Sequence, residues 1–157
     1  MQRFRTPEEV LQQVFGHRSF RPYQRRAIDE LLAGHDVMVL AATGGGKSLC
    51  YQVPALLRDG LTVGISPLVA LMQDQVRALQ TRGVRAACLH AQTSSDEIWE
   101  IRGQIDADEL DLLYLTPERV LRTGLPGCVT VPPAAATDVR RPAREAVSEA
   151  THWTLVP

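Results

Sequence analysis

Apolar residues follow two alternating patterns along the chain. Short, nearly continuous apolar runs predict four buried strands, at residues 37–41, 61–66, 84–89 and 110–115. Apolar residues three and four positions apart predict helices, over residues 7–15, 22–32, 47–58, 67–82, 95–105 and from 117 onward. Strands that alternate with helices are typical of a parallel sheet covered on both faces, so the sequence predicts an α/β fold.

Residues 124–157 have a different character. They hold five of the ten prolines and an Ala-Ala-Ala run, and neither a period of 2 nor a period of 3.6 persists in them. We therefore expect an incomplete domain over residues 1–123, followed by a tail that is disordered or translated out of frame.

Composition narrows the class of protein. Hydrophobic residues make up 45% and charged residues 22% of 157 residues, which is typical of one globular domain. The formal net charge of −1 gives no strong overall attraction to nucleic acid or membrane, although such a chain can still carry a local basic groove. With no signal peptide and no apolar run of the roughly 20 residues that span a membrane, we expect a soluble, cytoplasmic protein with no membrane partner. Three isolated cysteines predict reduced thiols.

A glycine-rich loop separates the first predicted strand from the helix that follows it. Its residues are Ala41-Ala42-Thr43-Gly44-Gly45-Gly46-Lys47-Ser48. Glycines let successive backbone N–H groups turn toward an anion, and the N-terminus of the next helix adds its dipole. Lys47, the only lysine among seventeen basic residues, suits the β- and γ-phosphates of ATP, and the Ser48 hydroxyl suits Mg²⁺. The loop therefore predicts a site for ATP and Mg²⁺ rather than a turn without a ligand.

Several segments together resemble the first motifs of RecQ helicases, which belong to helicase superfamily 2. One is the loop itself, with alanine at its first position and Thr-Gly-Gly-Gly-Lys-Ser after it. The others include Phe20-Arg21-Pro22 with Gln24, Ser66-Pro67-Leu68 and Thr116-Pro117-Glu118, and the resemblance runs in order from residue 7 to residue 122. It implies the three-layer parallel sheet of a P-loop NTPase of RecA-like type, here truncated. It also implies ATP-dependent DNA unwinding in recombination and repair.

The resemblance implies a role for each loop residue. Lys47 would be catalytic, and it would hold the phosphates together with Thr43, Gly44, Gly45, Gly46 and Ser48. Gln24 would hydrogen-bond the adenine edge with Arg21 beside it. The family usually has an aromatic residue at His17 and commonly a glycine at Tyr23, so adenine selectivity is left open here.

DNA contacts are implied at two junctions between a strand and a helix. Ser66-Pro67 and Thr116-Pro117 each place a cap residue and a proline where N–H groups can hold a backbone phosphate of single-stranded DNA. The alternative is that Ser66 and Thr116 only cap helices. Trp99, beside Ile98 and Ile101, is interpreted as a packing residue rather than a platform for a base.

The family's Asp-Glu-Ala-His segment and its second lobe do not occur in these 157 residues. Hydrolysis needs carboxylates that position Mg²⁺ and water. The nearest ones are expected to form a solvated loop: Asp106, Asp108, Glu109 and Asp111. We therefore expect an ATP-binding fragment of a RecQ-like helicase that is inactive alone, with a non-helicase nucleotide- or DNA-binding module or a small P-loop kinase as alternatives. The oligomeric state is left open.

Overall fold

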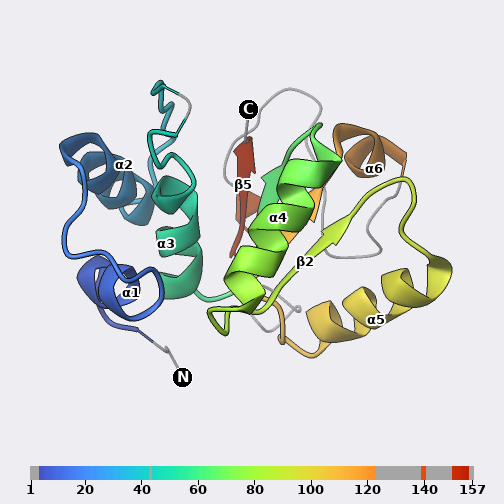
Figure 1. Ribbon diagram of the computed structural model, residues 1–157. Coiled ribbons are helices and arrows are strands. Elements are labelled where there is room, and N and C mark those ends of the chain that lie inside the picture. The colour runs from blue at the N-terminus through green and yellow to red at the C-terminus, as the bar shows by residue number, and fades with distance from the viewer. Residues whose placement is uncertain (1–3, 43, 123–138, 141–149, 156–157) are drawn as a thin grey trace. The chain divides into compact units, whose positions relative to one another are not determined.

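Figure 1 shows the computed structural model of the protein, which describes residues 4–42, 44–122, 139–140 and 150–155. The chain forms two compact units, residues 1–59 and residues 60–157. Each unit has its own set of packed elements.

The first unit is helical. Its helices are α1 (Pro7–Gln13), α2 (Pro22–Leu32) and α3 (Leu49–Leu57), and both α1 and α2 pack against α3. The Thr6 hydroxyl accepts the backbone N–H of Glu9 at 3.2 Å, which confirms the predicted start of α1. Every residue of α3 is buried, and both other helices of the unit pack against it.

The predicted first strand, at residues 37–41, is wrong. These residues form no strand, and Met38 and Leu40 are 85% and 89% exposed. A strand is held by hydrogen bonds to a neighbouring strand, so an apolar run without such a neighbour stays irregular. Apolar content alone could not show that this partner is missing.

The second unit contains a sheet of strand order β2-β3-β1-β5-β4. Its strands are β1 (Thr62–Ile65), β2 (Ala86–Leu89), β3 (Leu112–Leu115), β4 (Val139–Arg140) and β5 (Ala150–Leu155). The first three, together with β5, run parallel, and β4 pairs antiparallel with β5. The three other predicted strands are thus confirmed, each a few residues shorter than predicted, and the α/β class is confirmed with them.

Strand β5 lies within the tail. The sequence predicts no regular structure in residues 124–157, yet β5 pairs with β1 from Thr62↔His152 to Ile65↔Leu155. The edge of β1 supplies hydrogen-bonding partners to a segment whose aromatic and β-branched residues favour a strand. The β1 edge is therefore not open, and apart from β4 and β5 the tail lies outside the described residues.

Helices cover both faces of this sheet (Figure 1). They are α4 (Val69–Gln80) on one face and α5 (Ser95–Asp106) with α6 (Pro117–Arg122) on the other. On the α5 face, Ile98 and Ile101 pack against a core that includes Val63 and Leu113. Tyr114 alternates to the opposite face and is 1% exposed. The predicted three layers are therefore present in this unit.

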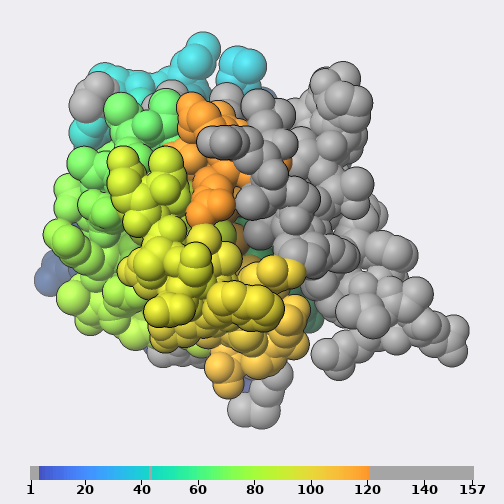
Figure 2. All heavy atoms as spheres, turned by 90° about the vertical axis from the view of Figure 1, so that its right-hand side faces the viewer, coloured from blue at the N-terminus to red at the C-terminus, as the bar shows by residue number. Residues whose placement is uncertain are grey.

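Trp99, predicted as a packing residue, is exposed instead, and so is Leu68. Helix α4 begins at Val69 rather than Pro67, so Leu68 is its N-terminal flanking residue and is 55% exposed. Trp99 is 70% exposed, with the Arg102 guanidinium 5.4 Å from its ring centre. Because each helical residue is turned about 100° from the previous one, Trp99 points away from the sheet that Ile98 contacts. Figure 2 shows the face of the second unit on which α5 lies.

Candidate nucleotide-binding site

The glycine loop lies in the first unit and its shape depends on its glycines. Gly44 and Gly46 have φ of 76° and 83°, in the left-handed region that other residues rarely adopt. The N–H of Gly45 donates to the carbonyl of Ala42 at 3.0 Å, and a Cβ on Gly45 would lie 2.9 Å from that oxygen. The predicted tight curl of this loop is present, and Thr43 lies outside the described residues.

The first turn of α2 contacts this loop through two consecutive side chains. Gln24, which is 3% exposed, donates from Nε2 to the carbonyl of Gly46 at 2.9 Å. Its Oε1 accepts the backbone N–H of Arg21 at 2.9 Å. The hydroxyl of Tyr23 donates to the carbonyl of Gly45. Residues that are more than twenty positions apart in the sequence therefore meet at this loop.

Lys47 and Ser48 stand at the start of α3. The Lys47 ammonium donates to the carbonyl of Ala41 at 2.7 Å. The Ser48 side chain makes no capping hydrogen bond, although Ser48 directly precedes α3. Within the described part of the chain, no acceptor takes the backbone N–H groups of Gly46, Lys47 and Ser48. Three successive donors beside an ammonium group can bind an anion, and the positive end of a helix dipole favours one there.

The predicted DNA-contact residues follow two neighbouring strands of the second unit. Ile65 pairs with Leu115, so Ser66 and Thr116 lie side by side at the carboxyl edge of the sheet. Both are buried, and Ser66 Oγ accepts the N–H of Leu68 at 3.2 Å. That bond closes a turn just before α4, whose N-cap is Leu68, so Ser66 does not cap this helix. A DNA contact at Ser66, Pro67 or Thr116 stays a prediction.

Of the carboxylates before β3, Asp106, Asp108 and Glu109 are exposed as expected, and Asp111 is not. Asp111 is paired with Arg85, whose Nε donates to Oδ1 at 3.1 Å. This pairing raises the pKa of the Arg85 guanidinium. The interpretation as a solvated loop is therefore wrong for Asp111, which ties the start of β3 to the start of β2. Among the described residues, no group of three or more His, Cys, Asp or Glu side chains could hold a metal ion.

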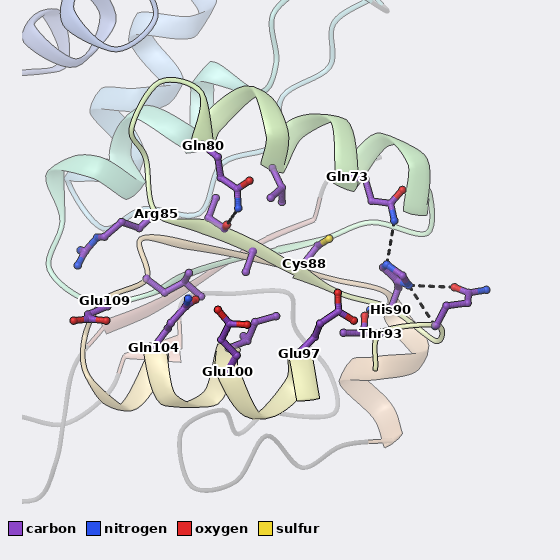
Figure 3. A pocket seen from close by; sticks show the side chains of 16 residues that line it. Gln73, Gln80, Arg85, Cys88, His90, Thr93, Glu97, Glu100, Gln104 and Glu109 are labelled. Carbon is purple, nitrogen blue, oxygen red and sulfur yellow. Dashed lines mark hydrogen bonds between the residues drawn. The ribbon is translucent and has the colours of Figure 1, made fainter. Parts of the chain in front are cut away.

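A groove of about 770 Å³ lies in the second unit between α4 and α5 (Figure 3). Gln73 and Gln80 line it from α4, and Glu97 and Glu100 line it from α5. The half-buried Cys88 is a free thiol there, and its pKa is raised by burial and then by the carboxylate of Glu97. A thiol that stays protonated is a poor nucleophile. None of the site residues predicted from the sequence lines this groove.

Two of the three cysteines lie in the described residues, and both are free, as predicted. Cys50 is buried in α3, and burial raises the pKa of its thiol to about 11. Within the described residues, no helix is long and apolar enough to span a membrane.

Sequence reasoning missed the contact of Tyr23 with the loop. It noted Tyr23 only as a replacement for a common glycine, and the hydroxyl bond to Gly45 needs the folded first unit to be seen. The available signal was position: Tyr23 directly precedes Gln24, so both sit in the first turn of α2.

Comparisons with known proteins agree with this geometry. A family of DEAD/DEAH box helicases matches residues 21–129. An ATP-dependent DNA helicase RecQ of Synechocystis is 50% identical over 114 residues, which cover 73% of this chain and 24% of that protein. The RecQ of Haemophilus influenzae is 46% identical over 116 residues, covering 74% of this chain and 19% of that protein. The chain thus spans about a fifth to a quarter of the length of these relatives.

A solved structure supports the fold independently. The DUF1998 helicase MrfA, crystallised with DNA and AMPPNP, superposes with a TM-score of 0.60 at 18% identity, covering 73% of this chain and 17% of that one. At this identity the likeness concerns the fold alone. The family match spans well over half of the chain and includes the loop, Gln24 and the Thr-Pro-Glu segment. The chain therefore belongs to the DEAD/DEAH box helicase family, and within that family it is similar to the RecQ helicases.

Proposed function

We propose that this chain binds ATP with Mg²⁺ through the loop 41–48, as the nucleotide-binding part of a RecQ-like ATP-dependent DNA helicase. The observation that carries the proposal is the row of backbone N–H groups at Gly46, Lys47 and Ser48, which have no acceptor within the described residues. A row of donors at a helix start suits a polyphosphate, because each phosphate oxygen can accept more than one of them.

Lys47 and Ser48 have separate roles in this proposal. The Lys47 ammonium exchanges the carbonyl of Ala41, 2.7 Å away, for phosphate oxygens. That exchange favours the phosphates, because a charged acceptor makes the stronger hydrogen bond. The Ser48 hydroxyl, which caps no helix, is free to join the shell of Mg²⁺. Mg²⁺ supplies neutralisation of the phosphate charge when it is bound.

Base recognition would involve Gln24 and Arg21. Both ends of the Gln24 amide are already bonded, to Gly46 and to the N–H of Arg21. An adenine can therefore hydrogen-bond Gln24 only if one of these bonds is exchanged or shared, which reduces the binding free energy that the base contributes. We infer that the phosphates contribute most of the affinity, with weak discrimination between ATP and GTP.

The proposed DNA contacts are at Ser66, Pro67 and Thr116. Their support is that Ser66 and Thr116 adjoin at the carboxyl edge of β1 and β3, where loops of parallel sheets commonly bind ligands. Contacts there would reach the backbone of single-stranded DNA and would not read bases. Fluorescence anisotropy of a labelled oligonucleotide tests this contact. Unchanged affinity in Ser66→Ala combined with Thr116→Val would contradict a contact through their hydroxyl groups.

The 157 residues lack an Asp-Glu-Ala-His segment, so we expect nucleotide binding without efficient hydrolysis by this chain alone. Unwinding, recombination and repair would then be activities of a longer helicase that contains these motifs. Strong DNA-stimulated ATPase activity of the purified chain would contradict this expectation. Tight DNA binding that ignores ATP would instead favour the alternative of a non-helicase binding module.

The direct test is calorimetric titration of the chain with ATP in the presence of Mg²⁺. Lys47→Ala removes the ammonium group and is expected to weaken binding roughly tenfold or more, since hydrogen bonds to charged groups contribute about 1.5–3 kcal/mol. Arg26→Ala is the matched control, because it removes an exposed positive charge from α2 outside the loop. Equal affinities of Lys47→Ala and Arg26→Ala would refute the proposal.

A further inference from the structure

Two consecutive carbonyl groups of the loop are each held by a side chain of α2. The hydroxyl of Tyr23 donates to the carbonyl of Gly45, and Nε2 of Gln24 donates to the carbonyl of Gly46 at 2.9 Å. The Gly46 carbonyl also accepts the N–H of Leu49 at 3.3 Å, whereas no other donor from the described residues reaches the carbonyl of Gly45. Among the described residues, Tyr23 is therefore the group that fixes where that carbonyl points.

The direction of a carbonyl determines the direction of the next N–H group. The peptide bonds of the loop are trans, so the C=O of one residue and the N–H of the next point in opposite directions. When Tyr23 holds the carbonyl of Gly45 toward α2, the N–H of Gly46 points away from α2. Gln24 has the same effect on the N–H of Lys47. These two N–H groups belong to the row of donors in the proposed phosphate site that have no acceptor within the described residues.

Without such bonds the loop would have little preference for this arrangement. Gly44 and Gly46 both have positive φ, and glycine adopts either sign of φ at similar cost. The peptide between Gly45 and Gly46 can therefore rotate by half a turn with few steric barriers. Rotated, it would direct the Gly45 carbonyl at the phosphates, and a carbonyl oxygen repels an anion.

We propose that Tyr23 is a positioning residue of the nucleotide site, which keeps the Gly45–Gly46 peptide in the orientation that binds phosphate. The inference rests on the proposed function, because it concerns the same loop. Tyr23 does not touch the nucleotide in this role and acts through the backbone of Gly45. Its close fit agrees with this role, since a Cβ on Gly45 would lie 3.3 Å from the Tyr23 hydroxyl.

Tyr23→Phe tests the proposal, because it removes the hydroxyl and keeps the ring. The dissociation constants of ADP and of inorganic pyrophosphate are measured by calorimetry with Mg²⁺ on the full chain. Both are expected to rise by the same factor, roughly three- to tenfold, which corresponds to one lost hydrogen bond. Equal loss is the signature of an effect on the phosphate cradle, because pyrophosphate has no base or ribose.

Amide NMR spectra give a second readout that a general loss of stability would not produce. The signals of Gly46 and Lys47 are expected to shift or broaden in Tyr23→Phe while those of α1 stay in place. Tyr114→Phe is the matched control, since it removes a tyrosine hydroxyl from β3 in the second unit and is expected to leave both affinities unchanged.

Three results would overturn the inference. Affinities that are unchanged or tighter in Tyr23→Phe would show that the hydroxyl does not favour the binding orientation. A loss confined to ADP would place the effect at the base or ribose. If the unaltered chain binds neither ADP nor pyrophosphate, the proposed function fails and this inference fails with it. Measurements on the unaltered chain are enough to distinguish this outcome from the other two.

Discussion

The three loop glycines allow a stability prediction that can be worked out residue by residue. In Gly44→Ala the new Cβ meets nothing within 4 Å, so the cost is only that of a left-handed backbone at φ of 76°. This cost is roughly 1–2 kcal/mol. In Gly46→Ala the same backbone cost applies at φ of 83°, and the new Cβ would also lie 2.6 Å from Nε2 of Gln24.

Gln24 cannot give way cheaply to that Cβ. Its side chain is 3% exposed and is bonded at both ends of the amide, to Gly46 and to the N–H of Arg21. Displacing it leaves buried polar groups without partners, at about 1–3 kcal/mol. Gly46→Ala should therefore lower the free energy of unfolding of the first unit by about 2–5 kcal/mol, more than Gly44→Ala does.

The assay is urea unfolding followed by far-ultraviolet circular dichroism, whose helical signal includes α1 to α3 of this unit together with α4 to α6 of the second unit. A double-mutant cycle isolates the clash, because in a Gln24→Ala background the Cβ of Gly46→Ala meets no amide. There the cost of Gly46→Ala is expected to fall to that of Gly44→Ala, giving a coupling of about 1–3 kcal/mol. The reasoning is refuted if Gly44→Ala destabilises as much as Gly46→Ala, or if the cycle shows no coupling.

Two further predictions concern other parts of the chain. The Ser94 hydroxyl accepts the N–H of Glu97 at 3.3 Å, and the Glu97 carboxylate accepts the N–H of Ser94 at 2.9 Å. Ser94→Ala should therefore destabilise α5 by about 1 kcal/mol in thermal unfolding, whereas the control Ser95→Ala should not. The Glu97 carboxylate also accepts the Ser94 hydroxyl at 2.7 Å, and its bonds from the N–H and the hydroxyl of Ser94 lower the pKa of Glu97. Ser94→Ala removes the hydroxyl bond, whose contribution is present above the carboxyl's unfolded pKa and is lost as pH falls through the folded pKa. A Ser94→Ala effect that is equal at neutral and strongly acidic pH would contradict this reasoning. Burial raises the pKa of the Cys50 thiol to about 11. At pH 8, Cys50 of the folded chain should therefore react with a thiol reagent far more slowly than Cys50 of the chain unfolded in urea. Equal rates would mean that α3 is not buried.

Local sequence determined where α1 and α5 begin and where the glycine loop lies. Thr6 with Glu9 starts α1 and Ser94 with Glu97 starts α5, because each pair bonds within one turn. Glycine lets the loop curl, since Gly44 and Gly46 adopt left-handed φ at little cost, whereas the bonds from Tyr23 and Gln24 hold its peptides in one orientation. Because these features depend on residues that are close in the sequence, the resemblance to RecQ helicases could be identified from short motifs. The family match agrees with it.

Only the tertiary structure decided which apolar segments become strands and which side chains meet. The apolar pattern predicts a buried strand equally at residues 37–41 and at residues 62–65, but within the described residues only 62–65 pair with neighbouring strands. Likewise, β5 is a strand because it pairs with the edge of β1. The bond from Tyr23 to Gly45 likewise joins two turns that the sequence separates. Pairing and long-range hydrogen bonds depend on chain topology, whereas caps and glycine turns depend on residues within one turn of each other.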